Sequence, residues 1–200
     1  MKAVSQILSA IIIVTISLTL FLVGYNWLKP ILEKRQDMIK VERVKAVFDP
    51  LNPSSLPAKI EYLAKFGGED QLTLDVNGLW ILDESTESIE FVFYSKVSPV
   101  AANGEWVPLT GGNCEEPEEG IVGVDSPSVV CARADRFAGG YNITYKVYFR
   151  KLRDEVTNTI YQIDLEKHTA SKIMSTGKTI RMFRAPSENL TSPKIIILLV

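Results

Sequence analysis

The feature that most constrains this chain is an uncharged segment that runs from Val4 to Leu28. A helix of about 25 residues spans about 37 Å, whereas the hydrocarbon core of a bilayer is about 30 Å thick. The segment is therefore predicted to be a helix that lies in a membrane or in an equally apolar assembly. It is too long for the apolar part of a secretory signal peptide, and Gly24-Tyr25-Asn26-Trp27 offers no small-residue cleavage site.

Helical periodicity continues beyond the uncharged segment as far as Phe48. Apolar residues share one side of this second half, namely Ile31, Met38, Val41, Val44 and Phe48, and Leu32, Ile39 and Val47 widen the stripe. Pro30 separates the two halves and is expected to cause a kink or a short break. We therefore predict a helix over residues 4–48 that is apolar all round at first and then amphipathic, with its second half lying on a globular domain.

The remainder of the chain, residues 49–200, is predicted to be a β-rich globular domain. From about Leu56 the apolar residues alternate with polar ones, as in the segment from Ile143 to Phe149, and clusters of Gly, Pro, Asn and Asp separate about eight or nine short strands. Asn77-Gly78 is a strong turn signal. The predicted fold class is α+β, with a long N-terminal hydrophobic α-helix followed by an antiparallel β-sandwich-like domain.

The chain ends with six consecutive apolar residues after Lys194. This run is too short to span a bilayer, and an exposed apolar strand would promote aggregation. We expect it to form a central strand of the domain's own sheet. The alternative is a strand that is donated to a neighbouring subunit.

Charge and composition give no support to catalysis or to nucleic-acid binding. The net charge is −2, and because Lys29–Lys45 carries +3 and Lys2 carries +1, residues 46–200 carry −6. The single histidine, His168, and the two cysteines fit no metal-ligand spacing, and the clusters Glu115–Glu119 and Asp83–Glu87 are expected to be solvated acidic loops. We therefore predict a protein that is not an enzyme and has no metal site and no cofactor.

The first residues, Met-Lys-Ala-Val-Ser-Gln-Ile-Leu-Ser-Ala, place a basic and a small residue directly before the apolar segment. This arrangement resembles the class III signal peptide of archaeal type IV pilin-like and archaellin-like proteins. Bacterial pilins usually have a glutamate at the position of Leu8, so the archaeal form is the better match. The resemblance implies that a prepilin peptidase recognises Lys2, Ala3 and Val4, cleaves after Ala3 and removes residues 1–3.

The resemblance also implies a function. The mature chain would be a structural subunit of an extracellular type IV pilus-like filament that serves adhesion, surface attachment or motility. It would sit in the membrane before assembly and then form a homopolymer through its N-terminal helix with the help of the pilus assembly machinery. The residues expected to form the contacts are Ile7, Ile11, Ile13, Leu18 and Phe21.

Two alternatives stay open at this point. The chain can be a single-pass, membrane-anchored extracytoplasmic β-domain that acts as a binding module or as a minor pilin. Its orientation is also open, because Lys29, Lys34 and Arg35 follow the apolar segment whereas only Lys2 precedes it. A count of basic residues would place the domain in the cytoplasm, whereas the pilin resemblance places it outside.

An external domain would carry two further features. Cys114 and Cys131 are expected to form a disulfide that pins the loose Gly-, Pro- and Glu-rich part of the domain, with two reduced cysteines as the alternative. Asn142-Ile143-Thr144 and Asn189-Leu190-Thr191 match the N-glycosylation sequon, which makes Asn142 and Asn189 candidate glycosylation sites.

Overall fold

The computed structural model describes residues 2–115, 117–186 and 191–200, with the backbone alone for residues 2–10. The helices are α1 (Lys2–Phe48) and α2 (Leu56–Phe66). The strands are β1 (Glu69–Thr73), β2 (Leu79–Asp83), β3 (Ser88–Ser95), β4 (Val107–Pro108), β5 (Gly120–Ile121), β6 (Ser128–Phe137), β7 (Gly140–Phe149), β8 (Leu152–Arg153), β9 (Ile160–Tyr161), β10 (Asp164–Lys167), β11 (Met174–Ser175), β12 (Thr179–Arg184) and β13 (Lys194–Leu199).

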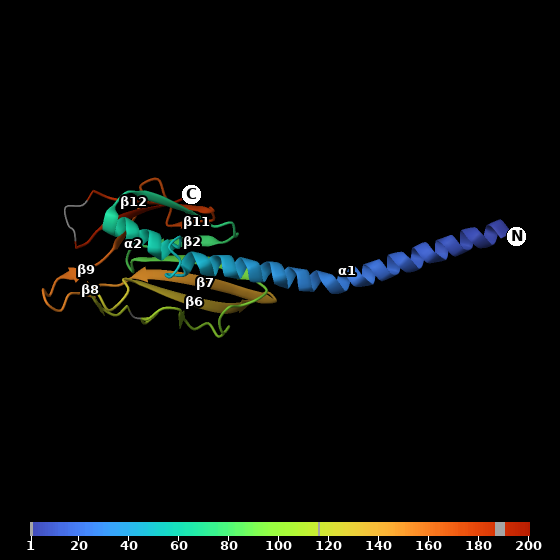
Figure 1. The fold of residues 1–200 in the computed structure, drawn as a ribbon, viewed down its shortest axis with the longest axis horizontal. Helices are drawn as coiled ribbons and strands as arrows, with labels where there is room; N and C mark the ends of the chain where they lie inside the picture. Colours follow the sequence, from blue (N-terminus) through green and yellow to red (C-terminus); the bar gives the residue numbers. More distant parts are fainter. Residues whose placement is uncertain (1, 116, 187–190) are drawn as a thin grey trace.

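The molecule consists of a long helix and a sheet-rich body at the C-terminal end of that helix (Figure 1). The first half of α1 extends away from the body, and its second half lies on the body beside β7. The predicted α+β fold class is therefore confirmed, with a long N-terminal helix followed by a domain of mainly antiparallel sheets.

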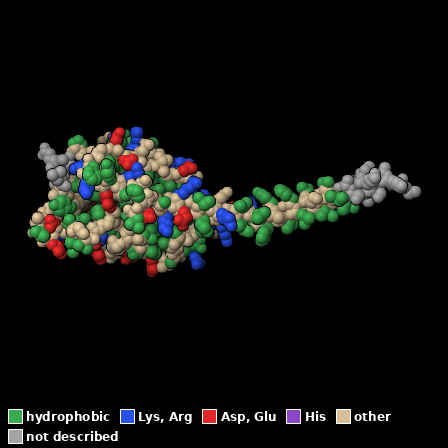
Figure 2. Space-filling view, viewed as in Figure 1, with side chains coloured by type: hydrophobic (Ala, Val, Ile, Leu, Met, Phe, Trp, Pro, Cys, Tyr) green, Lys and Arg blue, Asp and Glu red, His purple; other side chains and the backbone are tan. Residues whose placement is uncertain are grey.

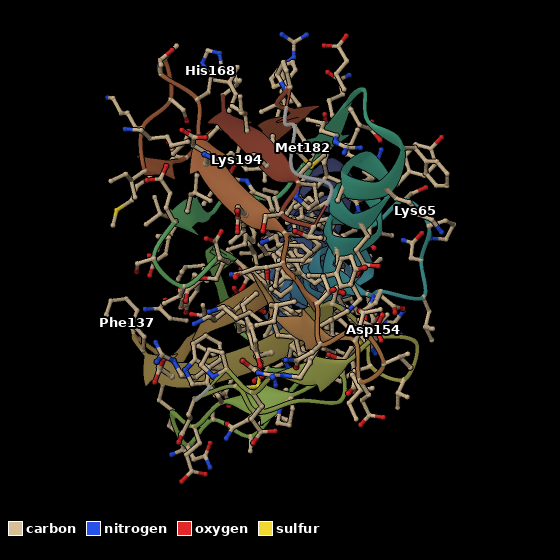
Figure 3. All side chains as sticks on the ribbon, turned by 90° about the vertical axis from the view of Figure 1, so that its left-hand side faces the viewer. Lys65, Phe137, Asp154, His168, Met182 and Lys194 are labelled. Atoms are coloured by element: carbon tan, nitrogen blue, oxygen red, sulfur yellow. A yellow bond between two sulfur atoms is a disulfide. The ribbon has the colours of Figure 1, made fainter. Side chains whose placement is uncertain are left out.

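Two larger sheets and one small sheet form the body. The larger two are a six-stranded antiparallel sheet of order β11-β2-β3-β7-β6-β4 and a four-stranded sheet of order β1-β12-β13-β10. The third sheet has the order β5-β8-β9. In Figure 3, Met182 and Lys194 mark the four-stranded sheet, Phe137 marks the six-stranded sheet and Lys65 marks α2. Two strand pairs, β10–β13 and β5–β8, are parallel.

One continuous hydrophobic core joins both helices to both larger sheets. Helix α1 contacts β3 and β7, whereas α2 contacts β1, β12 and β13. Val44 and Phe48 of α1, Ile60 of α2, Phe91 of β3 and Ile197 of β13 are all fully buried in this core. The end of α1 is therefore part of the body's interior, although the sequence divides the helix from the domain at residue 48.

The C-terminal run of apolar residues forms β13, which lies between β12 and β10 within the chain's own sheet. Ile195, Ile197 and Leu199 are buried on one face, while Ile196 and Leu198 are half-buried on the other. The prediction of a central strand of the domain's own sheet is confirmed, because pairing on both edges satisfies the backbone and burial of one face removes the apolar side chains from water.

Helix α2 was not predicted, since alternation of period two was expected from Leu56. The segment begins with Ser55, whose hydroxyl accepts a hydrogen bond from the Ala58 N–H at 3.3 Å, and it ends at Gly67 with a φ of 78°. Leu56, Ile60 and Leu63 are buried at helical spacing. A serine cap, a proline in the first turn and a glycine after the last turn are all helix signals that the alternation pattern concealed.

A kink or a short break was expected at Pro30. Helix α1 continues through Pro30 without a break, and Figure 1 shows that its axis changes direction near the middle of its length, which agrees with a kink. Asn77-Gly78, predicted as a turn, lies in the connection from β1 to β2, which belong to different sheets. A Cβ atom at Gly78 would lie 2.3 Å from the Phe91 ring, so this glycine permits close packing. The described residues also form thirteen strands, more than predicted, because several have only two residues.

Candidate functional site

The described part of the apolar helix has no partner within the chain. Residues 11–28 project from the body as a rod that is covered by hydrophobic side chains (Figure 2). The exposed fractions of Ile11, Ile13, Leu18 and Phe21 are 58%, 61%, 59% and 68%. Ile7 lies in the same helix, but its side chain is outside the described residues. This helix is long and apolar enough to cross a membrane, and none of its most apolar part is buried.

The hydroxyl groups along this rod are compatible with an apolar environment. Thr15 Oγ1 donates to the carbonyl of Ile11, and Thr19 Oγ1 donates to the carbonyl of Thr15, each at 2.8 Å. In lipid or in a packed bundle of helices, polar groups need partners that do not depend on water. The helix supplies those partners for Thr15 and Thr19 itself, so these two residues add little to the cost of burying the rod.

Aromatic stacking fixes the C-terminal end of α1 in the body. The Phe48 ring lies 5.4 Å from the Tyr145 ring and 6.0 Å from the Trp80 ring, measured between ring centroids. Val44 and Val41 are buried one and two turns earlier, respectively. The predicted stripe is thus confirmed over its last part only, because Ile31 and Met38 are exposed.

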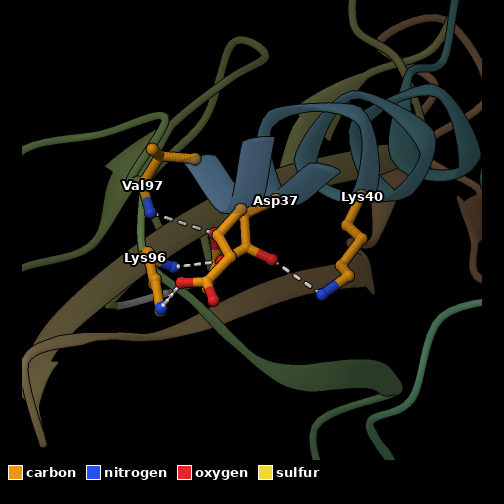
Figure 4. A network of polar contacts seen from close by, with 6 residues as sticks. Asp37, Lys40, Lys96 and Val97 are labelled. Carbon is orange, nitrogen blue, oxygen red and sulfur yellow. Dashed lines mark hydrogen bonds and ion pairs between the residues drawn. The ribbon is translucent and has the colours of Figure 1, made fainter. Parts of the chain in front are cut away.

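Where the buried stripe ends, polar contacts among Glu33, Asp37, Lys40 and Lys96 hold α1 to the body; we call them the clamp (Figure 4). Asp37 is 7% exposed, and its carboxylate accepts hydrogen bonds from Lys40 Nζ at 2.7 Å and from the backbone N–H of Lys96 at 2.8 Å. One turn earlier, the carboxylate of Glu33 pairs with Lys96 Nζ. The clamp therefore joins α1 to the segment that follows β3, at the point where the helix leaves the body.

The charges of the clamp are stabilised in the folded state. Burial acts to raise the pKa of Asp37, but the hydrogen bonds from Lys40 and from the Lys96 backbone outweigh burial and lower that pKa below its usual value. The hydrogen bond from Lys96 lowers the pKa of Glu33. Asp37 is therefore ionised at neutral pH, and its negative charge is balanced by neighbours on both elements.

A second pair of carboxylates protects a sheet edge. Strand β10 is at the edge of the four-stranded sheet, and its Lys167 N–H donates to Glu84 Oε1 at 2.5 Å. The N–H of Leu165 donates to the carboxylate of Glu87 in the same way. Burial raises the pKa of Glu87 to about 7. The expectation that Asp83–Glu87 is merely a solvated acidic loop is therefore wrong, because an unpaired strand edge needs acceptors and this loop supplies them.

The disulfide between Cys114 and Cys131 is confirmed, with an S–S distance of 2.09 Å. Cys131 is in β6, and together with Val129 and Tyr148 the bridge forms a small second core on the outer face of the six-stranded sheet. The Tyr148 hydroxyl donates to the Asn113 carbonyl at 2.5 Å. The bridge thus pins the segment around Cys114 to β6, as the sequence predicted.

The candidate modification sites lie in different surroundings. Lys2, Ala3 and Val4 are in the first turns of α1, where only the backbone is described. Asn142 is half-buried in β7, between β3 and β6, and Thr144 of its sequon is buried. Asn189 lies outside the described residues. The Asn142 sequon is therefore part of a central strand and is not on a surface loop.

The described part of the body shows two other features that bear on chemistry. A pocket of about 270 Å³ is bordered by Glu61 of α2 and Arg150, and burial raises the pKa of Glu61. His168 is half-buried, and its Nδ1 accepts a hydrogen bond from the Ala170 N–H at 3.1 Å, which gives it a role in a turn. Among the described residues, no group of three or more His, Cys, Asp or Glu side chains is placed to hold a metal ion.

Comparison with known proteins yields no match to a family model, to a curated protein or to a solved structure. The functional interpretation therefore depends on the residues of this chain and on their geometry. The site that the geometry singles out is α1, because it is the one described element whose apolar surface is left in solvent over several turns.

We expect the substitution Asp37→Ala to destabilise the body by about 2 kcal/mol, because it removes the buried, charged acceptor of the hydrogen bonds from the Lys96 N–H and from Lys40. Asp37→Asn should cost less, since the amide oxygen can still accept the bond from the Lys96 N–H. The measurement is chemical denaturation of the full chain in detergent, followed by the fluorescence of the body's tryptophans. Gln36→Ala, at an exposed position of the same helix turn, is the control, and an equal loss in both alanine variants would contradict the clamp.

We expect the body to lose stability as the pH rises from about 4.5 to 7.5. Glu87 has a raised pKa in the folded state, so its contribution is complete below pH 4.5 and is lost as it ionises near pH 7. In Glu87→Gln this loss should be smaller by roughly 2 kcal/mol. Denaturation curves across this pH range test the prediction, with Glu155→Gln in an exposed turn as the control. Identical pH profiles for wild type and Glu87→Gln would refute it.

Proposed function

We propose that this chain is a structural subunit of an extracellular type IV pilus-like filament that assembles through its N-terminal helix. In this role the chain is not an enzyme. It resides in the membrane before assembly, a prepilin peptidase removes residues 1–3, and the assembly machinery adds the mature subunit to the filament at the cell surface. The filament would then serve adhesion, surface attachment or motility.

The observation that carries the proposal is the exposure of α1. An apolar side chain of the size of leucine loses about 1.5–3 kcal/mol when it is left in water instead of being buried, and residues 11–28 expose such side chains on all sides. The rod therefore needs an apolar partner along its whole length. Both a bilayer and a bundle of identical helices provide one. Transfer of the helix from the bilayer to the bundle is feasible because water is excluded from its apolar side chains in both.

The disulfide supports an external location for the body. Disulfides form and persist in oxidising compartments and are rare in the cytosol. The Cys114–Cys131 bridge therefore favours the outward orientation over the one that a count of Lys29, Lys34 and Arg35 suggests.

A second candidate function is that of a single-pass anchored binding module that never polymerises. The favouring observation is that the apolar part of α1 is long enough to span a bilayer alone. Trp27 and Tyr25 would then lie at the membrane interface. The two candidates differ in whether native material contains filaments and in the residue with which the mature chain begins.

Processing provides the first test. Lys2 and Ala3 precede the apolar segment directly, so the mature chain should begin at Val4. Mass spectrometry of the protein from its native membranes or filaments measures this terminus. A chain that retains Met1, or that is cut near Trp27, would contradict the pilin-like proposal and favour an anchor or a signal peptide, respectively.

Assembly provides the second test. Ile13→Asp places a charge in the middle of the exposed rod, at a cost of about 3 kcal/mol in an apolar environment. Filaments seen by negative-stain electron microscopy should disappear, whereas denaturation of the full chain in detergent should be unchanged because residue 13 is far from the body. Ile13→Leu is the control and should assemble normally. Normal filaments from Ile13→Asp would show that this helix is not the core of the assembly.

A further inference from the structure

Helix α1 carries a continuous line of exposed residues on the side that the body leaves free. In its second half this line consists of Leu28, Leu32, Arg35, Ile39, Glu42 and Ala46, which we call the seam. The residues follow one another at alternating steps of four and three, the spacing at which helices pack against each other along their length. Continued towards the N-terminus with the same steps, the line passes through the exposed Phe21 and Leu18 to Ile11.

The body packs on the side of α1 opposite the seam and leaves the seam exposed. It binds the opposite side of α1 through Asp37, Val41, Val44 and Phe48, all of which are buried. On the seam, Leu28, Leu32 and Ile39 remain 48%, 56% and 54% exposed. An apolar surface that starts in the projecting rod therefore continues past the membrane-length segment and runs alongside the body.

The two charged residues of the seam limit how a partner can dock. Arg35 and Glu42 are seven residues apart, which corresponds to about 10.5 Å along the helix axis, so they occupy equivalent positions in successive repeats of the pattern. Neither belongs to an ion pair with another described residue of the chain. If two parallel copies packed level, Arg35 would face Arg35 and Glu42 would face Glu42, and both contacts would be repulsive.

We infer that the seam binds a second copy of this chain, parallel to the first and displaced along the helix axis by seven residues. With this displacement, Arg35 of one copy faces Glu42 of the next, and the repulsion becomes attraction. Two copies at the same height in a membrane repel each other through these like charges. Their seams can therefore bind only when one copy is displaced along the helix axis relative to the other. The inference rests on the proposed function, since both copies must enter the assembly from the same membrane and hence be parallel.

Cysteine cross-linking tests the displacement directly. Both native cysteines are in the disulfide and the chain has no free cysteine among its described residues, so thiols introduced by Leu32→Cys and Ile39→Cys can be followed selectively. The two full-length variants are produced in the same cells, and their membranes and filaments are oxidised under mild conditions. Because a disulfide needs closely spaced Cβ atoms, the mixed 32–39 dimer should exceed the 32–32 and 39–39 dimers roughly fivefold or more. A dominant 32–32 dimer, or no 32–39 dimer, would overturn the inference.

Charge reversal tests the pairing independently. Arg35→Glu and Glu42→Arg each create like-charge contacts in the displaced arrangement, so each should reduce the amount of filament by roughly fivefold or more. The double variant with both changes restores opposite charges and should recover assembly. Lys34→Glu makes the same change of charge at an adjacent residue that is outside the seam, and it is the matched control. Failure of the double variant to recover, or an equal loss in Lys34→Glu, would overturn the pairing.

The seven-residue displacement and the proposed filament function can be contradicted separately. If the wild type forms filaments but the cross-links are level, only the displacement by seven residues is wrong. If the wild type forms no filaments, the proposed function is wrong, and cross-linking in the membrane still decides whether the seam binds a second copy with this displacement.

Discussion

The structure depends on an apolar helix that its own body cannot cover. Phe21 is 68% exposed and Ile13 is 61% exposed in a rod that projects beyond the sheets. Burial of apolar surface is the largest favourable contribution to folding and association, so a rod of this kind is stable only beside another apolar phase or surface. The remaining features of the molecule determine how the rod is held and on which side it can be approached.

The body holds α1 through two sets of contacts, the aromatic stacking around Phe48 and the clamp. Phe48 is stacked among aromatic rings in the core, and about three and four turns earlier Asp37 and Glu33 bind the segment after β3. A helix that is fixed at several successive turns cannot pivot freely at the surface of the body. Force or displacement applied to the rod is therefore transmitted to the sheets, which suits a subunit that bears load in a filament.

Much of the architecture could be predicted from the sequence because it follows from local patterns. The uncharged segment, the alternating strands, the Cys114–Cys131 bridge and the central C-terminal strand were all anticipated. Features that depend on distant neighbours were not. The role of Gly78 depends on the Phe91 ring, and the acidic Glu87 is explained only by the edge of β10, which lies far along the chain. Helix α2 was missed for a different reason, since its caps were present but were outweighed by the alternation pattern.

Electron cryo-microscopy of surface filaments isolated from native cells is the most direct test of the central claim. The account predicts a filament whose centre is a bundle of parallel α1 helices, with residues 11–28 enclosed by copies of themselves and the sheet-rich bodies on the outside. The account would be contradicted if the chain were found only as separate copies in the membrane, or if filaments containing it were held together by the bodies while the helices remained in the bilayer.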